Sequence, residues 1–384
     1  MCDMKKDWEV KKLGEILKLE YGKPLPDEKR VINGNFPVYG ANGLKGRSNV
    51  FYSDKKTIIV GRKGSAGEIN LTEEKFWPLD VTYFVTYDER KYDLLFLFHL
   101  LSLLNLPKLA KGVKPGINRN EVYNLEANIP PLPEQKRIVS VLDKCFTAID
   151  KAKANAEQNL KNAKELFVNY LQKVLEGEKD WEIKKLGDVC NLKSGTTIST
   201  SLERAEGDIL YVKVGDMTMQ NNDVEINTSS RFVNRDEISK TQIIPNGAVI
   251  FPKRGGAIAT NKKRKIIKPT IVDLNIMAII PKDKIDNNYF YYWFQLIDLK
   301  SLSNGTSIPQ INNYSFDEVY IPFPPLKIQQ SIVRQLDSLK TQTKKLETVY
   351  NKKISDLEEL KKSILQDAFR GKLTAEATIK LLRK

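Results

Sequence analysis

The chain has 384 residues, a length that predicts two globular units with connecting segments rather than one compact core. It carries 62 lysines and arginines against 48 aspartates and glutamates, so its formal net charge is +14. Such a charge favours a polyanionic partner, either nucleic acid or an acidic membrane surface. The longest apolar run, residues 94–104, is shorter than the roughly 18 to 20 residues of a membrane span, and this excludes a spanning protein.

The reactive side chains are few and scattered. The first twelve residues contain no apolar core of the kind that a signal peptide needs, so we expect a cytoplasmic protein. Cys2, Cys145 and Cys190 lie far apart and form no CxxC pair, which predicts neither a disulfide framework nor a zinc cluster. His99 is the sole histidine, and most metal or histidine-base chemistry is therefore disfavoured. We expect no metal site and no cofactor in this chain.

An internal repeat organises the sequence. Residues 7–15 (DWEVKKLGE) recur at residues 180–188 (DWEIKKLGD), an offset of 173. Pro130-Pro131-Leu132 recurs as Pro324-Pro325-Leu326, an offset of 194. The chain is therefore a tandem duplication whose second copy holds 21 additional residues between the repeated blocks, as variable modules on a repeated frame would.

In each copy a β-rich run leads into a basic glycine turn. Residues 57–60 precede the turn at 61–67, and residues 248–251 precede the turn at 252–257. Glycines allow close backbone approach and open amides toward an anion, while the adjacent lysines and arginines supply charge. Neither turn has the spacing of a Walker A motif or of GxGxxG, so nucleotide hydrolysis is not indicated. A single such turn could equally be a plain hairpin, but its recurrence favours contact with phosphates or base edges.

Two long stretches without an acidic residue, 94–120 and 238–272, add to this basic surface. A solvated charged face is the alternative interpretation, but stretches this long beside glycine turns favour DNA. The residues expected to bind DNA are Arg47, Arg62, Lys63, Gly64, Ser65, Lys111, Lys114, Arg119, Lys253, Arg254, Gly255, Lys262, Lys263, Arg264 and Lys265. Arginines of this set, together with Asn49 and Asn261, are the side chains that could read bases.

After each proline cluster comes a stretch of 43 residues without proline or glycine, 134–176 and 328–370, each ending before a glycine. The apolar spacing of four and three residues predicts a heptad seam with one stutter. The seam positions singled out are Ile138, Leu142, Ile149 and Leu160 in the first helix and Ile332, Leu336, Leu346, Ile354 and Leu357 in the second. The alternative is that each helix packs onto its own module.

These features predict an α+β fold with two similar globular modules. Because the second module follows the first helix directly, the second helix must return antiparallel to pack on the first, which places the modules at opposite ends of a pseudo-twofold coiled-coil rod. The expected organisation is a first module over 1–132, a helix over 133–177, a second module over 178–326, a helix over 327–371 and a tail over 372–384.

The order of these parts resembles the specificity subunit of type I restriction-modification systems. The resemblance rests on the Trp-Glu-x-x-x-Leu-Gly opening, the Pro-Pro-Leu-Pro-Glu-Gln helix start at 130–135, the long helix and the repetition of all three. The second helix start departs from the pattern at 327–329, where Lys-Ile-Gln replaces Pro-Glu-Gln. The resemblance implies two target recognition domains that read a bipartite site on double-stranded DNA.

By the same resemblance, two modification subunits with S-adenosylmethionine-dependent adenine methylation bind this subunit, and restriction subunits driven by ATP and Mg can join. Chemistry would belong to those partners, so this chain is expected to be non-catalytic. Two alternatives stay open: a coiled-coil scaffold whose heads bind proteins, and a nucleic-acid enzyme with a divergent site. His99 and the aromatic run at 289–294 are interpreted as core rather than as catalytic or base-stacking groups.

Overall fold

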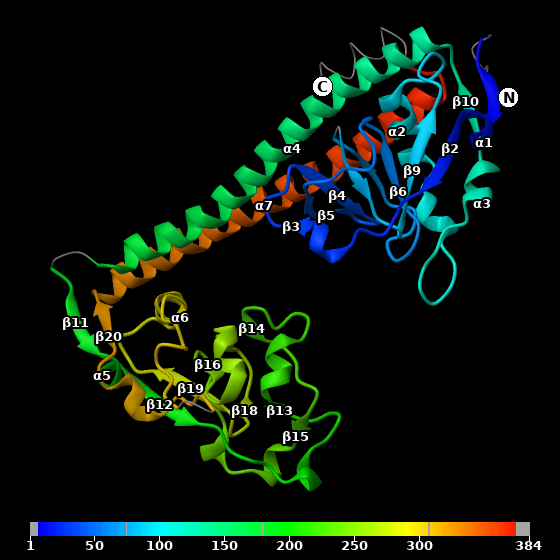
Figure 1. Cartoon of the computed structure of the whole chain (residues 1–384). Helices are drawn as coiled ribbons and strands as arrows, with labels where there is room; N and C mark the ends of the chain where they lie inside the picture. Colours follow the sequence, from blue (N-terminus) through cyan, green and yellow to red (C-terminus); the bar gives the residue numbers. More distant parts are fainter. Residues whose placement is uncertain (1–6, 74, 178–179, 306–307, 374–384) are drawn as a thin grey trace. The chain divides into compact units, whose positions relative to one another are not determined.

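The computed structural model describes residues 7–73, 75–177, 180–305 and 308–373 (Figure 1). The chain divides into two compact units. Unit 1 comprises residues 1–158 with 350–384, and unit 2 comprises residues 159–349. Two 44-residue helices, α4 (Leu132–Leu175) and α7 (Leu326–Phe369), each contribute one end to each unit. No helix in the described part of the chain is long and apolar enough to cross a membrane.

In the part of unit 1 that the structure describes, three sheets are accompanied by three short α-helices besides the ends of α4 and α7. The antiparallel sheet β2-β9-β6-β7 is formed by Leu17–Tyr21, Thr82–Tyr87, Ile58–Gly61 and Ile69–Leu71. The sheet β3-β5-β4-β8 is formed by Arg30–Val31, Gly43–Ser48, Phe36–Gly40 and Trp77–Pro78. The third pairs β1 (Glu9–Lys12) with β10 (Glu126–Ile129), and the helices are α1 (Leu13–Ile16), α2 (Leu94–Leu103) and α3 (Arg119–Tyr123). The mixture confirms the expected α+β character.

Unit 2 repeats this plan with different additions. Its five-stranded sheet β12-β19-β16-β17-β14 is formed by Cys190–Ser194, Ile276–Pro281, Val249–Pro252, Arg264–Ile266 and Glu225–Ile226. A second sheet, β15-β13-β18, is formed by Phe232–Val233, Ile209–Val212 and Thr270–Val272. β11 (Glu182–Lys185) pairs with β20 (Tyr320–Phe323), and the helices are α5 (Leu186–Val189) and α6 (Asn287–Gln295).

The tandem duplication is therefore visible as a shared frame. The Trp-Glu block forms β1 and β11, and each pairs with the strand that leads into the proline cluster. β2, β9 and β6 have the same order and antiparallel register as β12, β19 and β16. Offsets of 173 for β2 and β12, 191 for β6 and β16, and 194 for β9 and β19 place most of the extra residues before β16. Variation in length thus lies between frame strands.

A buried glutamine fastens each long helix to the frame. The Gln135 amide accepts from the Asp93 N–H (2.9 Å) and donates to the carbonyls of Lys91 (3.1 Å) and Pro130 (2.9 Å). Gln329, 194 residues later, accepts from Asp286 N–H (2.8 Å) and donates to the carbonyls of Lys284 (3.1 Å) and Pro324 (2.8 Å). Both glutamines are 0% exposed. The glutamine of the helix-start motif therefore fixes the first turn of α4 and α7.

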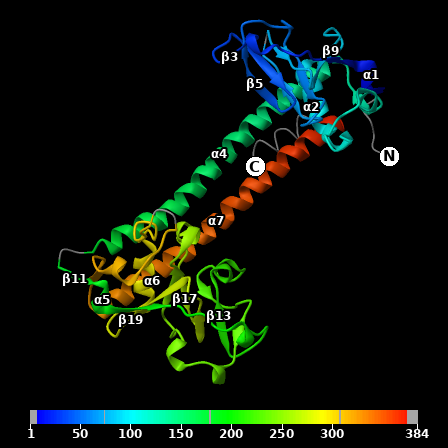
Figure 2. The ribbon, with the colours of Figure 1, turned by 60° about the horizontal axis from the view of Figure 1, so that its bottom comes forward.

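The two long helices pack antiparallel where their ends meet in unit 1. The Lys153 ammonium contacts the Glu358 carboxylate (2.6 Å) and Lys361 contacts Asp150 (2.7 Å), so rising numbers on α4 meet falling numbers on α7. In unit 2 the Tyr170 hydroxyl bonds to Gln335 (2.7 Å), and α6 packs against both helices (Figure 2). Gly177 and Gly371, with φ of +85° and +71°, follow the helix ends as predicted.

Most of the predicted seam positions are buried or half-buried, and one is exposed. Ile138, Leu142, Ile149, Ile332 and Leu336 are at most 6% exposed, while Leu160, Ile354 and Leu357 are half-buried. Leu346 is 40% exposed, so its assignment to the seam is wrong. Thr343 is buried and the next half-buried position is Glu347, four residues on. The stutter of the second helix thus lies here, because 3.6 residues per turn cannot hold a strict heptad.

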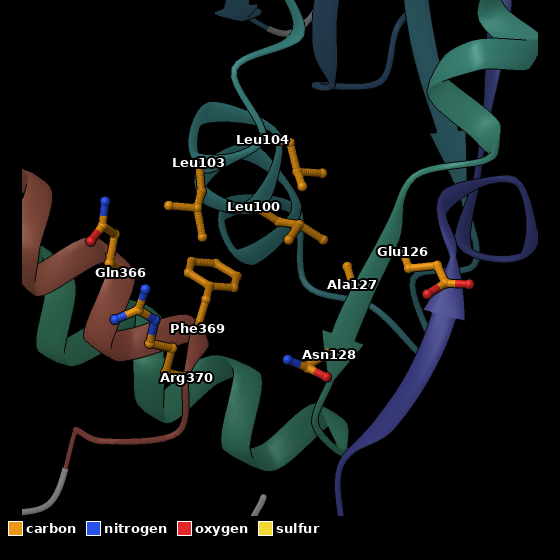
Figure 3. A pocket seen from close by; sticks show the side chains of 9 residues that line it. All are labelled: Leu100, Leu103, Leu104, Glu126, Ala127, Asn128, Gln366, Phe369 and Arg370. Carbon is orange, nitrogen blue, oxygen red and sulfur yellow. The ribbon is translucent and has the colours of Figure 1, made fainter. Parts of the chain in front are cut away.

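A cavity of about 320 Å³ lies in unit 1 between α2, β10 and α7 (Figure 3). Leu100 and Leu103 of α2 and the next residue, Leu104, face it. Gln366 and Phe369 of α7 line it together with the next residue, Arg370. None of the residues that we expected to bind DNA lines this cavity. It is an apolar packing gap at the end of α7, separate from the surface described next.

Candidate nucleic-acid interface

In unit 1 the backbone brings two of the predicted basic segments together. The chain from Lys111 to Gly116 forms a hairpin closed by two backbone hydrogen bonds of 2.9 and 3.0 Å. The second half of this hairpin then pairs with the glycine turn. Gly64 N–H donates to Pro115 O (2.9 Å), and Ile117 N–H donates to Arg62 O (3.0 Å). We call these paired segments, residues 62–65 and 111–119, ribbon 1.

Unit 2 builds the same arrangement. Asn304 and Gln310 close a hairpin by backbone bonds of 3.0 and 2.9 Å. Gly255 N–H donates to Pro309 O (2.8 Å), and Ile311 N–H donates to Lys253 O (2.9 Å). We call the described segments 253–255, 304–305 and 308–312 ribbon 2. Gly64 and Gly255 have φ of +80° and +72°, a left-handed conformation that explains a glycine at the same place in both ribbons.

The exposed face of ribbon 1 is cationic and aromatic. The guanidinium groups of Arg62 and Arg119 lie 5.3 and 5.0 Å from the ring of Tyr21, the last residue of β2. Arg62 also donates to the carbonyl of Asp80 (2.7 Å). Stacking on one ring holds both guanidinium groups in place without neutralising them, because a ring carries no net charge. Lys63, Gly64 and Lys114 are exposed, Ser65 is half-buried, and Lys111 pairs with Glu121 (2.5 Å).

Ribbon 2 offers mainly neutral polar groups at the matching positions. Ser194 ends β12 as Tyr21 ends β2, and its hydroxyl contacts the Lys253 ammonium (2.9 Å). Partial burial and the Arg254 charge lower the pKa of Lys253. Arg254 itself is exposed. Asn304, Asn312 and Tyr314 are joined by side-chain hydrogen bonds, and Gln310 donates to Asn312 (2.9 Å). The two frames are alike, whereas the side chains that they present differ.

The cluster at 262–265 corrects one of the predictions. Lys263 is 1% exposed, its ammonium donates to Ile297 O (2.5 Å) and Asn261 Oδ1 (3.0 Å), and it lies over the Phe294 ring. A DNA contact for Lys263 is therefore wrong: the side chain lies inside the fold. Lys265 is mostly buried and paired with Glu225 (2.8 Å). Runs of lysine and arginine in a sequence do not reveal such pairing, because Glu225 is distant in the chain.

Arg264 is also withdrawn into the fold. It is half-buried, its guanidinium donates to Lys263 O (2.9 Å), and burial lowers its pKa. Lys262 is half-exposed and is the member of the cluster best able to face a duplex.

Replacement of Lys263 by methionine should change how the free energy of unfolding depends on pH, because Lys263 is buried. Burial lowers the pKa of Lys263 from its ordinary value of 10.5 to about 8. Between pH 8 and 10.5 the unfolded chain binds more protons at this lysine than the folded chain, so its contribution to stability rises with pH. The free energy of unfolding of the wild type relative to Lys263→Met should increase by about 2 kcal/mol from pH 8 to pH 10, measured by urea denaturation. A difference that stays constant between pH 8 and pH 10 would contradict this burial.

Within the described residues, Arg47 makes no hydrogen bond with ribbon 1 and bonds instead to residues near its own strand. It belongs to β5 and donates to the carbonyls of Gly34 (2.5 Å) and Asn35 (2.9 Å), so its guanidinium is held against its own sheet. The nearby Asn49 accepts from the Asn35 N–H (3.3 Å). Both therefore have structural partners in the loop that joins β3 to β4.

Sequence reasoning missed Tyr21 and the amide cluster of ribbon 2. A signal for the second was present: Pro115-x-Ile117-Asn118 recurs as Pro309-x-Ile311-Asn312, at the offset of 194 that the proline clusters share. That repeat marks the strand of each hairpin that pairs with the glycine turn. Tyr21 had no such signal, because its importance comes from contacts with arginines far along the chain.

His99 and the aromatic run at 289–294 form packing contacts, as expected. His99 lies between the rings of Phe98 and Phe146, and burial lowers its pKa. The aromatic run at 289–294 is buried in the core of unit 2. Within the described residues, no group of three or more histidine, cysteine, aspartate or glutamate side chains is placed to hold a metal ion.

Fold and surface together define a tandem pair of α+β modules, each presenting a ribbon built on a glycine turn and each joined to long helices. The family model described as "Type I restriction modification DNA specificity domain" matches residues 5–161 and 178–356. The chain belongs to this family of type I restriction-modification DNA specificity domains.

Similar proteins are described as specificity subunits of type I restriction enzymes. The MjaVIII specificity subunit of Methanocaldococcus jannaschii is 27% identical, over 96% of this chain and 93% of its own. A putative type I restriction enzyme specificity subunit of Haemophilus influenzae is 26% identical, over 84% of each chain. The solved HsdS subunit of Thermoanaerobacter tengcongensis has a TM-score of 0.61 at 19% identity, covering 96% of this chain and 98% of its own. Another solved chain, from work on "complex assembly" and "conformational transition of the type I R-M system", reaches a TM-score of 0.76 at 19% identity, covering 97% and 100%. These two structures support the fold.

Proposed function

We propose that this chain is the non-catalytic DNA specificity subunit of a type I restriction-modification complex and reads a bipartite site on double-stranded DNA. The observation that carries the proposal is the recurrence of one ribbon on one frame in both units, with different side chains on its surface. A shared frame gives two readers the same architecture, while different side chains give them different targets. The readers would be the modules at 1–132 and 178–326, joined by the helices.

The chemistry of the ribbons fits this division. Arginines that are held but not neutralised, such as Arg62 and Arg119, suit phosphate oxygens or the guanine edge. Amide side chains, such as Gln310 and Asn312, suit the donor and acceptor pattern of adenine. Contacts would come from Arg62, Lys63, Gly64, Ser65, Lys111, Lys114 and Arg119 in unit 1, and from Lys253, Arg254, Gly255 and Lys262 in unit 2.

Partner subunits would supply the reaction. Two modification subunits would carry S-adenosylmethionine and methylate adenine, and restriction subunits would use ATP and Mg, in the cytoplasm. The long helices α4 and α7 would serve as spacer and docking surface, because their outer faces carry exposed apolar side chains such as Leu166 and Val349.

Co-expression with the cognate modification subunit should produce adenine methylation at a single split motif. Genome-wide mapping of N6-methyladenine in the expressing cells measures this and gives the sequence. Two short specific blocks around an unspecified spacer are expected, because two readers act on one duplex. A stable complex that methylates one uninterrupted motif would overturn the two-reader proposal.

A protein-binding scaffold is the second candidate, favoured by the exposed apolar side chains on the helices. It predicts binding to partners that does not depend on salt and no footprint on DNA. DNA binding through basic ribbons instead weakens steeply with salt, because neutralised phosphates release counterions. A salt titration of duplex binding by the assembled complex separates the two functions.

A further inference from the structure

Tyr314 lies at the surface of unit 2, just beyond ribbon 2, with its hydroxyl group held by two amide side chains. The amides of Asn304 and Asn312 donate to it at 2.5 and 3.0 Å. Gln310 in turn donates to Asn312 Oδ1 (2.9 Å), which fixes the direction of that amide. We call these four side chains the Tyr314 network. Tyr314 is 59% exposed, and ordering exposed side chains in this way costs conformational entropy.

The direction of the Tyr314 proton follows from its partners. Both contacts come from amide N–H groups, which can only donate, so the hydroxyl oxygen accepts in each. The hydroxyl group keeps one proton of its own, and no oxygen or nitrogen of the described residues accepts it. The proton therefore points to solvent. Tyr314 is a hydrogen-bond donor whose direction is set before a partner arrives, and such preorganisation lowers the entropy cost of binding.

The Tyr314 network is not repeated in the described part of unit 1. Three of its four members differ between the units, and the residues at their places in unit 1 are Lys111, Gly116 and Asn120. Asn118, the match of Asn312, instead accepts from the Asn120 N–H (2.9 Å) and begins α3. A contact that only held the shared frame together would be expected in both units. The network therefore belongs to what distinguishes the two surfaces.

The charge beside the network indicates the partner. Arg254 is exposed, and its backbone forms an isolated bridge with Gln310, so a cation lies on the segment next to the network. Phosphates suit such a cation, while base edges in the major groove suit an oriented neutral donor. The groove offers acceptors at purine N7, guanine O6 and thymine O4. A cytosine amino group or a thymine methyl group would instead leave the hydroxyl proton unpaired.

We infer that the Tyr314 hydroxyl is a specificity-determining group of unit 2 and donates a hydrogen bond to one base-edge acceptor of the DNA site. This inference rests on the proposed function and deepens it. The amides of Asn304 and Asn312 position the hydroxyl, and Arg254 supplies charge for the adjacent DNA backbone. A base pair with no acceptor at this place is rejected, because it leaves a desolvated hydroxyl group without a partner.

The test uses the full chain assembled with its modification subunit, without S-adenosylmethionine, on duplexes that carry the split site. Tyr314→Phe removes the hydroxyl group and keeps the ring. The control is Tyr320→Phe, because Tyr320 is also exposed in unit 2 but already donates its proton to Glu318 (2.8 Å). The duplexes are altered at one acceptor at a time: 7-deazapurines remove N7, whereas 4-thiothymine and 6-thioguanine weaken the carbonyl acceptor. Thermal unfolding confirms that each variant is folded.

Tyr314→Phe should bind the intact site roughly three- to tenfold more weakly than the wild type, about the value of one neutral hydrogen bond. One altered acceptor should weaken binding by the wild type and by Tyr320→Phe by a similar factor. The same alteration should leave the affinity of Tyr314→Phe unchanged, because one hydrogen bond can be lost only once. Asn304→Ala, which removes one of the two bonds to the hydroxyl, should show a smaller loss that depends on the same acceptor.

Affinity of Tyr314→Phe equal to that of the wild type would overturn the inference. So would a loss that no altered acceptor reproduces, because a purely structural role of the network predicts that result. Should Tyr314→Phe fail to fold, absence of coupling between Asn304→Ala and every altered acceptor would overturn it instead. A wild type that prefers the split site while one of these results holds overturns the inference alone, whereas a wild type without that preference overturns the proposed function as well.

Discussion

Replacement of Gln329 by leucine should lower the free energy of unfolding of unit 2 by about 2–4 kcal/mol, the largest stability effect that we expect from one side chain. Leucine fills a similar volume but neither accepts nor donates. The Asp286 N–H and the carbonyls of Lys284 and Pro324 would lose their side-chain partner. Buried backbone groups without a partner carry their full desolvation cost, because water cannot reach them.

The adjacent residue supplies a matched control. Gln330 is exposed, so Gln330→Leu changes the same side chain one position away without removing a buried bond. Urea denaturation should separate the two variants by most of the predicted difference. Gln135→Leu should behave in unit 1 as Gln329→Leu does in unit 2, because the two bond sets are equivalent. Equal stability of the Gln329 and Gln330 variants would show that the bonds contribute little.

The two buried glutamines also show why the duplicated frame could be predicted from the sequence. Gln135 and Gln329 stand in the recurring helix-start motif, and the Trp-Glu block forms the strand paired beside it. Local signals of this kind, such as prolines before a helix and a glycine after it, determine where elements begin and end. The tandem organisation, the two long helices and the α+β modules followed from these signals.

The surface could be predicted only in part. The glycine turns were identifiable because strand, glycine and charge are neighbours in the chain. Lys263 and Leu346 were assigned wrongly because their burial depends on the phase of a strand or a helix against distant elements. Tyr21 and the Gln310 cluster depend on contacts between segments far apart in sequence. The division of the chain into 1–132, 133–177, 178–326, 327–371 and 372–384 stays a prediction, and its final segment lies largely outside the described residues.

Neutralisation of ribbon 1 should give the largest effect on DNA binding. Arg62→Ala and Arg119→Ala should each weaken binding of the assembled complex to its split site by about 1–3 kcal/mol if they read bases. Their guanidinium groups share the Tyr21 ring, so removal of one also frees the other, and the double variant should differ from the sum of the single effects. Arg90→Ala is the control, because that exposed arginine pairs with Asp88 outside the ribbon.

The salt dependence distinguishes the two ways in which these arginines could act. Removal of an arginine that contacts a phosphate lowers affinity for every DNA sequence by a similar factor. It also reduces the magnitude of the slope of log affinity against log salt by about 1. An arginine on a base leaves that slope nearly unchanged and relaxes the preference at one base pair. Because Arg62 is already bonded to Asp80 O and stacked on Tyr21, its guanidinium is preorganised, and we expect the second pattern for it. Affinity equal to that of Arg90→Ala at every salt concentration would exclude ribbon 1 from the interface.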